Sequence, residues 1–201
     1  MEIKVQPIFP TVIGIVDLGR DFTPEEMAFF KGLDMRRNSG NLVSIDGYVL
    51  DKPEMADLRK FCDESINVYM KSVFRPKNDI SLKITQSWVN VTEQNEFHHK
   101  HNHANSAFSA AFYIHTHDGD LINFYKEDTS TVSFDAEEYD IMNSTKWWVP
   151  AKAGSMVMFP SYLTHDVPVK EHPGTRVSLS FNTFYVGKLG SEEGRTEVVF
   201  D

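Results

Sequence analysis

The spacing of hydrophobic residues changes near residue 80. Before that point, two segments carry apolar residues at helical spacing. Thr23 and Glu26 form the Thr-x-x-Glu pattern of a capping box, which predicts a helix from there to about Leu33. A second helix is predicted from Pro53, with an apolar stripe that is typical of a core-facing surface: Met55, Leu58, Phe61, Cys62, Ile66, Tyr69, Met70 and Val73.

From about Leu82 onward, the pattern predicts short strands separated by turns. The expected strands are Leu82–Val91, Phe97–His103, Phe108–His115, Leu121–Lys126, Trp147–Val149, Ser155–Phe159, Thr164–Val169 and Thr175–Val186. Asp118-Gly119 is typical of a hairpin turn between the third and the fourth of them. The sequence therefore predicts a mainly β fold with flanking helices, in which two sheets form a jelly roll.

Length and composition indicate one soluble domain. We expect a helical support region over 1–80, a jelly-roll core over 81–186 and a loosely held tail over 187–201. The net charge of -9 argues against nucleic acid as a partner, because phosphate binding depends on Lys and Arg. The single cysteine, Cys62, excludes an internal disulfide and suits a reducing compartment. We find no apolar run of ~20 residues and no signal-peptide pattern, so we expect a cytoplasmic protein without a membrane partner.

A run rich in histidine, His98-His99-Lys100-His101-Asn102-His103, carries the first candidate chemistry. Alternate residues of a strand share a face, which would place His99, His101 and His103 on one side and His98 on the other. Neighbours on one face lie ~6.6 Å apart, so two imidazoles can bind one metal whereas three would have to span about 13 Å. The ligand pair is then either His99/His101 or His101/His103.

The third candidate ligand is His165, which follows the block Phe159–Thr164. Three ligands on one side of a metal leave positions open for a co-substrate and O2, as in non-haem iron oxygenases. The alternative is an exposed strand that happens to be rich in histidine. Arg176, two residues before Ser178, favours the metal site because its planar guanidinium matches a carboxylate in two places. Arg176 could instead pair with a surface acid such as Glu171.

Several blocks along the chain carry a family resemblance. They are Ile8–Thr11, Ser87–Val91, His101–Ser106 with Ser109, Phe112-Tyr113, Phe159–Val167 and Arg176–Asn182, and the last two are the most specific. With these blocks the whole chain resembles the 2-oxoglutarate–Fe(II) oxygenases of marine phages and marine bacteria, within the prolyl-hydroxylase-like superfamily. An origin in a phage genome, with action in the host cytoplasm, is compatible with this resemblance.

The resemblance implies a double-stranded β-helix, Fe(II) as the metal, and 2-oxoglutarate and O2 as co-substrates. It favours His101 and His103 over the pair His99/His101, since the family's histidine pair is followed three residues on by a serine, here Ser106. With His165, these two would be the metal ligands. Arg176 and Ser178 would hold the distal carboxylate of 2-oxoglutarate, and Tyr113 resembles a tyrosine that serves the same carboxylate in related enzymes.

One position departs from the wider superfamily, whose pattern is His-x-Asp/Glu followed by a distant His. Position 103 is a histidine, which leaves an Fe(II) site one unit more positive and without a hard anionic ligand. The change could weaken iron binding, admit another metal, or leave a carboxylate from elsewhere to complete the site.

The leading hypothesis is an Fe(II)/2-oxoglutarate-dependent dioxygenase. It would hydroxylate a small molecule or a side chain with release of succinate and CO2. One alternative is a cupin-like metalloenzyme with three histidines that does not use 2-oxoglutarate, whose activity would be indifferent to Arg176→Ala. The other alternative is a non-catalytic jelly-roll module for binding or structure, which would hold no tight metal.

Overall fold

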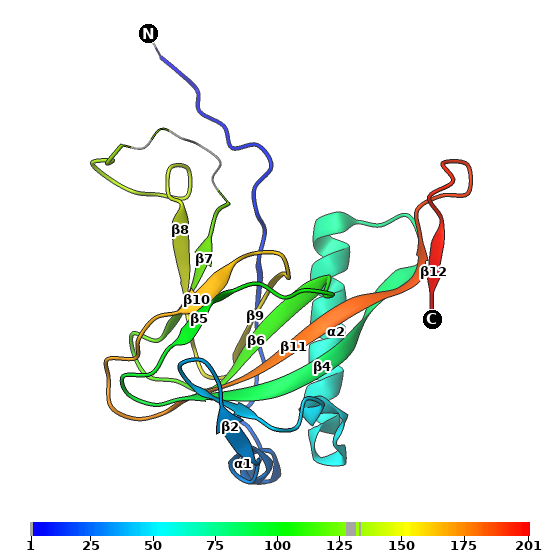
Figure 1. The fold of residues 1–201 in the computed structure, drawn as a ribbon. Helices are drawn as coiled ribbons and strands as arrows, with labels where there is room; N and C mark the ends of the chain where they lie inside the picture. The colour runs from blue at the N-terminus through cyan, green and yellow to red at the C-terminus, as the bar shows by residue number, and fades with distance from the viewer. Residues whose placement is uncertain (1, 128–131, 133) are drawn as a thin grey trace.

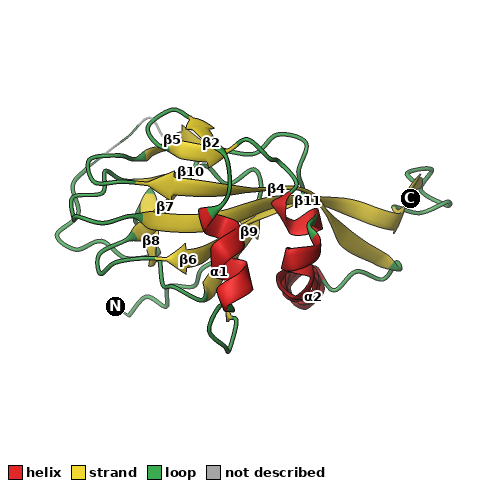
Figure 2. Cartoon of the chain, turned by 90° about the horizontal axis from the view of Figure 1, so that it is seen from below, coloured by secondary structure: helices red, strands yellow, loops and turns green. Residues whose placement is uncertain are grey.

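Two antiparallel sheets face each other, and helices cover the outer side of the larger sheet (Figures 1 and 2). This computed structural model describes residues 2–127, 132 and 134–201. The helices are α1 (Pro24–Lys31) and α2 (Ala56–Phe74), with short 3-10 turns η1 (Val49–Asp51) and η2 (Pro53–Met55) before α2. The arrangement confirms the predicted mainly β jelly-roll class with flanking helices.

The large sheet has the strand order β1-β9-β6-β11-β4-β3-β2, and β12 extends it by pairing with β11. Its strands are β1 (Gly14–Asp17), β2 (Met35–Arg37), β3 (Leu42–Ser44), β4 (Ile80–Thr92), β6 (Phe108–His115), β9 (Ser155–Pro160), β11 (Arg176–Leu189) and β12 (Val198–Phe200). The small sheet has the order β5-β10-β7-β8. Its strands are β5 (His98–His101), β7 (Leu121–Tyr125), β8 (Lys146–Pro150) and β10 (His165–Val167).

All eight predicted strands and both predicted helices are present, with ends that differ by a few residues. The capping box is formed as expected: the Thr23 hydroxyl accepts from the Glu26 amide, and the Glu26 carboxylate accepts from the Thr23 amide. Sequence reasoning missed β1, β2, β3 and β12. Each is three or four residues long, too short for a period-two pattern to stand out. The segment 1–80 is thus not only helical, and the tail over 187–201 adds a strand.

Strands β6 and β9 separate two hydrophobic clusters because their side chains alternate between faces. Phe112 and Met156 face the helices and join the cluster that includes residues of α1 and α2. Tyr113 and Phe159 face the small sheet and join the second cluster. Both strands are buried on both faces, which explains their nearly continuous apolar sequences. The second cluster is the one that borders the histidines.

Strand β11 lies between β4 and β6 and fixes which side chains share the inner face. Its register places Ser178 opposite Asn90 of β4 and opposite Tyr113 of β6. Arg176, two residues earlier, lies opposite Thr92. Alternate residues of a strand share a face, so Arg176, Ser178 and Tyr113 all point toward the small sheet. These are the three residues to which the family resemblance assigns carboxylate binding.

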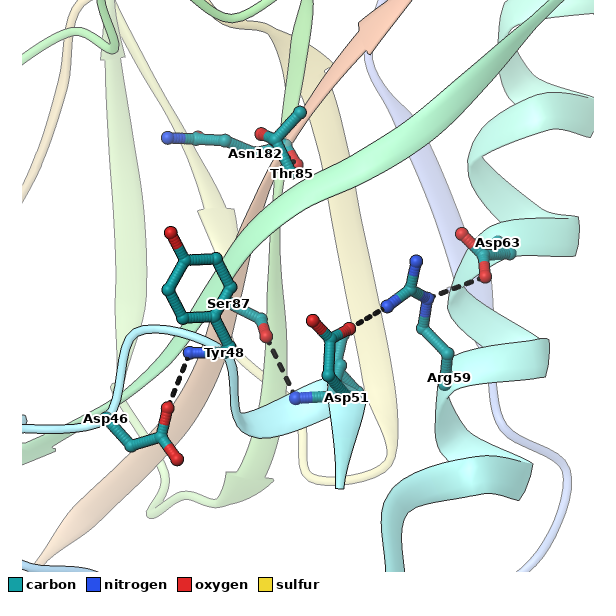
Figure 3. A network of polar contacts seen from close by, with 9 residues as sticks. Asp46, Tyr48, Asp51, Arg59, Asp63, Thr85, Ser87 and Asn182 are labelled. Carbon is teal, nitrogen blue, oxygen red and sulfur yellow. Dashed lines mark hydrogen bonds and ion pairs between the residues drawn. The ribbon is translucent and has the colours of Figure 1, made fainter. Parts of the chain in front are cut away.

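A polar network fastens the segment before α2 to β4 (Figure 3). The buried Ser87 hydroxyl accepts a hydrogen bond of 2.9 Å from the amide of Leu50. Arg59 of α2 bonds to both Asp51 and Asp63, the latter at 2.7 Å. The contacts to Ser87 and Asp51 hold η1 against the sheet on one side and against the helix on the other.

We expect Ser87→Ala to lower the free energy of unfolding by ~1–3 kcal/mol, because the buried Leu50 amide loses its acceptor. Thr85→Ala, two residues away on the same strand but exposed, is the control and should change stability by less than ~0.5 kcal/mol. Urea denaturation measures both. Equal effects of the two substitutions would contradict the role of Ser87.

Candidate functional site

The pairing of β5 with β10 brings the two histidine segments together. His165 lies opposite His101, and Val167 lies opposite His98. Two steps along β10 therefore correspond to three along β5, which is the count of a β-bulge. The expected alternation is therefore wrong for His98, which does not point away from His101. The centroids of the two rings are 4.6 Å apart in a stacked arrangement, and both residues line the same cavity.

Three of the predicted ligands converge. One ring nitrogen each of His101, His103 and His165 lies within 4.8 Å of the other two. The Nε2 atoms of His103 and His165 are 3.3 Å apart. Two ligands at ~2.1 Å from one ion lie at about this separation, so the geometry fits a shared metal. His99 is not part of this group, although it groups with His98 and His101.

Serine hydroxyls hold the loop that carries His103. The His103 amide donates to the Ser161 carbonyl at 3.0 Å. The Ser161 hydroxyl lies 2.6 Å from that of Ser106 and 2.7 Å from that of Ser109. The loop after β5 is thereby tied to the segment that leads to His165. Ser106 and Ser109, which belong to a block of the family resemblance, are both part of this network.

Backbone carbonyls orient two of the rings. Nδ1 of His101 lies 2.7 Å from the His99 carbonyl, and Nδ1 of His165 lies 2.9 Å from the Leu163 carbonyl. A carbonyl only accepts, so each Nδ1 carries the proton and each Nε2 carries the lone pair. Such a bond from the distal ring nitrogen is the usual support of a metal-binding histidine.

Burial keeps these imidazoles neutral. Desolvation, reinforced by the neighbouring His165 and His101, lowers the pKa of His103 to about 3. Desolvation also lowers the pKa of His165 to about 4 and that of His101 below its ordinary value. Neutral rings with free lone pairs are the form that binds metal.

Among the described residues, no carboxylate belongs to either group of metal-capable side chains. Asp166, beside His165, accepts hydrogen bonds of 2.7 Å from the Asn123 amide and from the Tyr125 hydroxyl. Its side chain is thus directed to the far side of the small sheet, because successive residues of a strand point to opposite faces. The donor set of the site is three imidazoles.

Arg176 lies in the same cavity and is buried with an acid that the sequence did not suggest. Its Nη1 atom lies 3.2 Å from a carboxylate oxygen of Asp120, and the two side chains are 4% and 3% exposed. The partner is therefore Asp120 and not Glu171. Burial lowers the pKa of Arg176 while Asp120 opposes the shift, and the group stays charged at neutral pH. The other oxygen of Asp120 accepts from the His117 amide at 2.9 Å.

Tyr113 and Ser178 complete this wall of the cavity. The Tyr113 hydroxyl is buried, and no described residue forms a hydrogen bond with it. Burial raises its pKa, so it remains a neutral donor. An unpaired buried hydroxyl is costly, and here it lies beside a buried guanidinium. The pair fits an anionic group with oxygen acceptors, such as the carboxylate of 2-oxoglutarate.

Sequence reasoning missed several residues of the cavity. Trp88 and Asn90 line it from β4, and the Trp88 ring lies 5.7 Å from that of His103. Their alternation along the block Ser87–Val91 was the signal that could have placed them on one face. His98 was missed because a bulge is not visible in the sequence. The ring centroids of His115 and His117 are 5.0 Å apart. Neither residue belongs to a group that could hold a metal within the described part of the chain.

Residues 86–182 match the model of the family described as "Putative 2OG-Fe(II) oxygenase". The match spans every predicted ligand of the metal and of 2-oxoglutarate. This match confirms the resemblance of the sequence to 2-oxoglutarate–Fe(II) oxygenases. The chain is accordingly an oxygenase of the class that uses Fe(II), 2-oxoglutarate and O2, and the predicted enzyme class and cofactors are confirmed at that level.

Solved structures share the fold at low sequence identity. A 2OG-Fe(II) oxygenase family oxidoreductase from Burkholderia pseudomallei is similar with a TM-score of 0.60 and 13% identity, over 85% of this chain and 84% of that one. HygX from Streptomyces hygroscopicus, solved with nickel, 2-oxoglutarate and hygromycin B, has a TM-score of 0.56 and 14% identity over 86% and 82%. A prolyl hydroxylase from Trichoplax adhaerens, solved with a peptide fragment, has a TM-score of 0.57 and 11% identity over 86% and 83%.

A search of curated protein sequences found no match. No helix within the described residues combines the length and the apolar character needed to cross a membrane.

We expect metal-free protein to lose stability as the pH falls below 6.5. The folded-state pKa values of His98, His103 and His165 lie at about 3, 3 and 4, below the ordinary value of 6.5. The unfolded chain therefore binds protons first, and the stabilisation present above pH 6.5 decreases toward pH 4. Each histidine contributes up to ~1.4 kcal/mol per pH unit.

Urea denaturation of metal-free protein at pH 7, 6 and 5 measures this effect. His98→Gln should reduce the slope, whereas His115→Gln, which changes an exposed histidine of β6 outside the cluster, should leave it unchanged. A stability that does not vary between pH 7 and 5 would contradict the neutral state of the cluster.

Proposed function

We propose that the protein is an Fe(II)/2-oxoglutarate-dependent dioxygenase that hydroxylates an organic substrate with release of succinate and CO2. One observation carries this proposal. The convergent nitrogens of His101, His103 and His165 line the same cavity as the buried guanidinium of Arg176. Metal-binding and carboxylate-binding groups thus lie in one enclosed space, as a bound iron and a bound oxo-acid would require.

The three histidines would hold the iron. Bound Fe(II), with 2-oxoglutarate and O2, supplies the oxidative decarboxylation that drives hydroxylation. The protein's own contribution is placement. The carbonyls of His99 and Leu163 keep His101 and His165 in the tautomer that offers Nε2. His103 needs the same tautomer, with its proton on Nδ1, for its Nε2 lone pair to bind.

Arg176, Ser178 and Tyr113 would hold the distal carboxylate of 2-oxoglutarate. Arg176 contacts Asp120 through Nη1, which leaves further N–H groups of its guanidinium for a second acceptor. The unpaired Tyr113 hydroxyl would gain a partner in the same carboxylate. Ser178 lies opposite Tyr113 in the sheet and would add a third donor.

The substrate is proposed to be a small molecule or a side chain of a larger one. HygX was solved with hygromycin B, and the Trichoplax enzyme was solved with a peptide fragment, so this fold accepts both kinds. The half-buried Trp88 beside His103 offers an aromatic surface for an apolar part of the substrate. The acidic net charge of -9 disfavours nucleic acid. The buried free thiol of Cys62 suits the reducing cytoplasm, where we place the enzyme.

The all-histidine donor set favours a second candidate, a three-histidine metalloenzyme that does not use 2-oxoglutarate. The two candidates differ in one property. Only the first requires Arg176 and Tyr113 to bind a co-substrate.

Anaerobic titration of metal-free protein with Fe(II), followed by 2-oxoglutarate, tests the proposal. We expect a weak visible absorption band that needs both additions, because 2-oxoglutarate on iron gives charge transfer that neither gives alone. A protein with bound Fe(II) and no such band would overturn the proposal in favour of the three-histidine alternative. A protein that takes up no metal would instead indicate a non-catalytic module.

We expect Arg176→Gln to weaken 2-oxoglutarate binding by at least ~10-fold while Fe(II) binding is retained, because a charge-assisted bond worth ~1.5–3 kcal/mol is lost. The substitution also leaves Asp120 without its partner, so it is combined with Asp120→Asn to avoid an unpaired buried charge. Titration of the absorption band gives both affinities. Arg195→Gln, an exposed arginine of the tail, is the control. Unchanged 2-oxoglutarate affinity would contradict the assigned role of Arg176.

A further inference from the structure

A second group of three imidazoles lies beside the first. One ring nitrogen each of His98, His99 and His101 lies within 4.8 Å of the other two. The ring centroids are 4.6 to 5.2 Å apart. We call His101, His103 and His165 the inner group, and His98, His99 and His101 the outer group. All three side chains of the outer group are partly exposed, whereas His165 of the inner group is buried. The group is thus less buried than the first one and is formed within a single short strand.

The bulge in β5 creates this group. In a regular strand, His98 and His99 would point to opposite faces, and only one of them could meet His101. The extra residue between the pairs His165–His101 and Val167–His98 removes that restriction.

An independent observation points to a ligand at this group. Nδ1 of His99 is buried and has no hydrogen-bond partner among the residues that the structure describes. Buried polar atoms are nearly always paired, so this nitrogen lacks a partner that a bound cation would supply. Neutral imidazole is a good ligand for divalent transition metals, and the group contains no carboxylate that would favour Ca²⁺ or Mg²⁺.

His101 belongs to both groups, and this sharing limits their occupancy. A neutral imidazole has one lone pair, because its other nitrogen carries the proton. His101 can therefore bind one metal at a time.

We propose that His98, His99 and His101 form a second metal position for Ni²⁺, Cu²⁺ or Zn²⁺, filled in place of the inner position. The position itself depends only on the outer group. Its competition with the inner position rests on the proposed function, since it requires His103 and His165 to bind the enzyme's metal. A nitrogen-preferring metal at the outer position takes His101 from the inner group and excludes iron.

Calorimetric titration of untagged, metal-free protein with Ni²⁺ tests the proposal. Wild type should bind one Ni²⁺ per chain despite its five clustered histidines. The variant H103A/H165A should still bind one, through the outer group, and H98A/H99A should bind one through the inner group. Removal of all four histidines should abolish binding, as should His101→Ala. The control H115A/H117A, which removes a histidine pair outside both groups, should behave as wild type.

Each deviation identifies a different failure. Loss of Ni²⁺ binding in H103A/H165A, with binding kept in H98A/H99A, would overturn the outer position and leave the proposed function intact. Binding kept in H103A/H165A but lost in H98A/H99A would support the outer position and contradict the proposed function. Two Ni²⁺ per wild-type chain would overturn the exclusion. Circular dichroism checks the fold, and H103N/H165N replaces the alanine variant if that variant does not fold.

Discussion

The antiparallel pairing of β5 with β10 is the constraint on which the site depends. His103 and His165 are 62 positions apart, yet their Nε2 atoms lie 3.3 Å from each other. The backbone register His165–His101 sets this proximity, and the bond from the His103 amide to the Ser161 carbonyl extends it beyond the end of the strand. Backbone hydrogen bonds, between β5 and β10 and from His103 to Ser161, thus hold the three neutral imidazoles close together. A metal ion would therefore bind to a preformed site.

The opposite wall depends on a buried ion pair. Taking a guanidinium and a carboxylate out of water costs several kcal/mol, which a single 3.2 Å contact between Arg176 and Asp120 offsets only in part. The pair is therefore better explained by function than by stability. Asp120 fixes the guanidinium and balances its charge. A second carboxylate would then be held by the remaining guanidinium donors and by the neutral hydroxyls of Tyr113 and Ser178.

Much of this architecture could be predicted from local pattern. The helical stripe of α2, the capping box at Thr23 and the alternation in the longer strands are properties of short segments, and each is found as expected. The approach of His165 to His101 could be suspected because both flank strands of one expected jelly roll. Three features could not be predicted. The bulge that turns His98 inward, the choice of Asp120 as partner of Arg176, and the short strands β1 to β3 all depend on contacts between distant segments.

The histidine at position 103 changes how the site can choose its metal. A carboxylate at position 103 would give the inner group a hard anionic ligand, which the outer group of three imidazoles does not have. The two groups would then differ in the metals that they prefer. With histidine at position 103, each group consists of three neutral imidazoles, and the two groups share His101. Donor type then cannot favour one position over the other. What remains is the surroundings: only the inner group includes the buried His165, opposite the wall with Arg176 and Tyr113. An anionic co-substrate bound at that wall would supply the missing negative charge, and selection of the inner position would therefore depend on the co-substrate as much as on the protein.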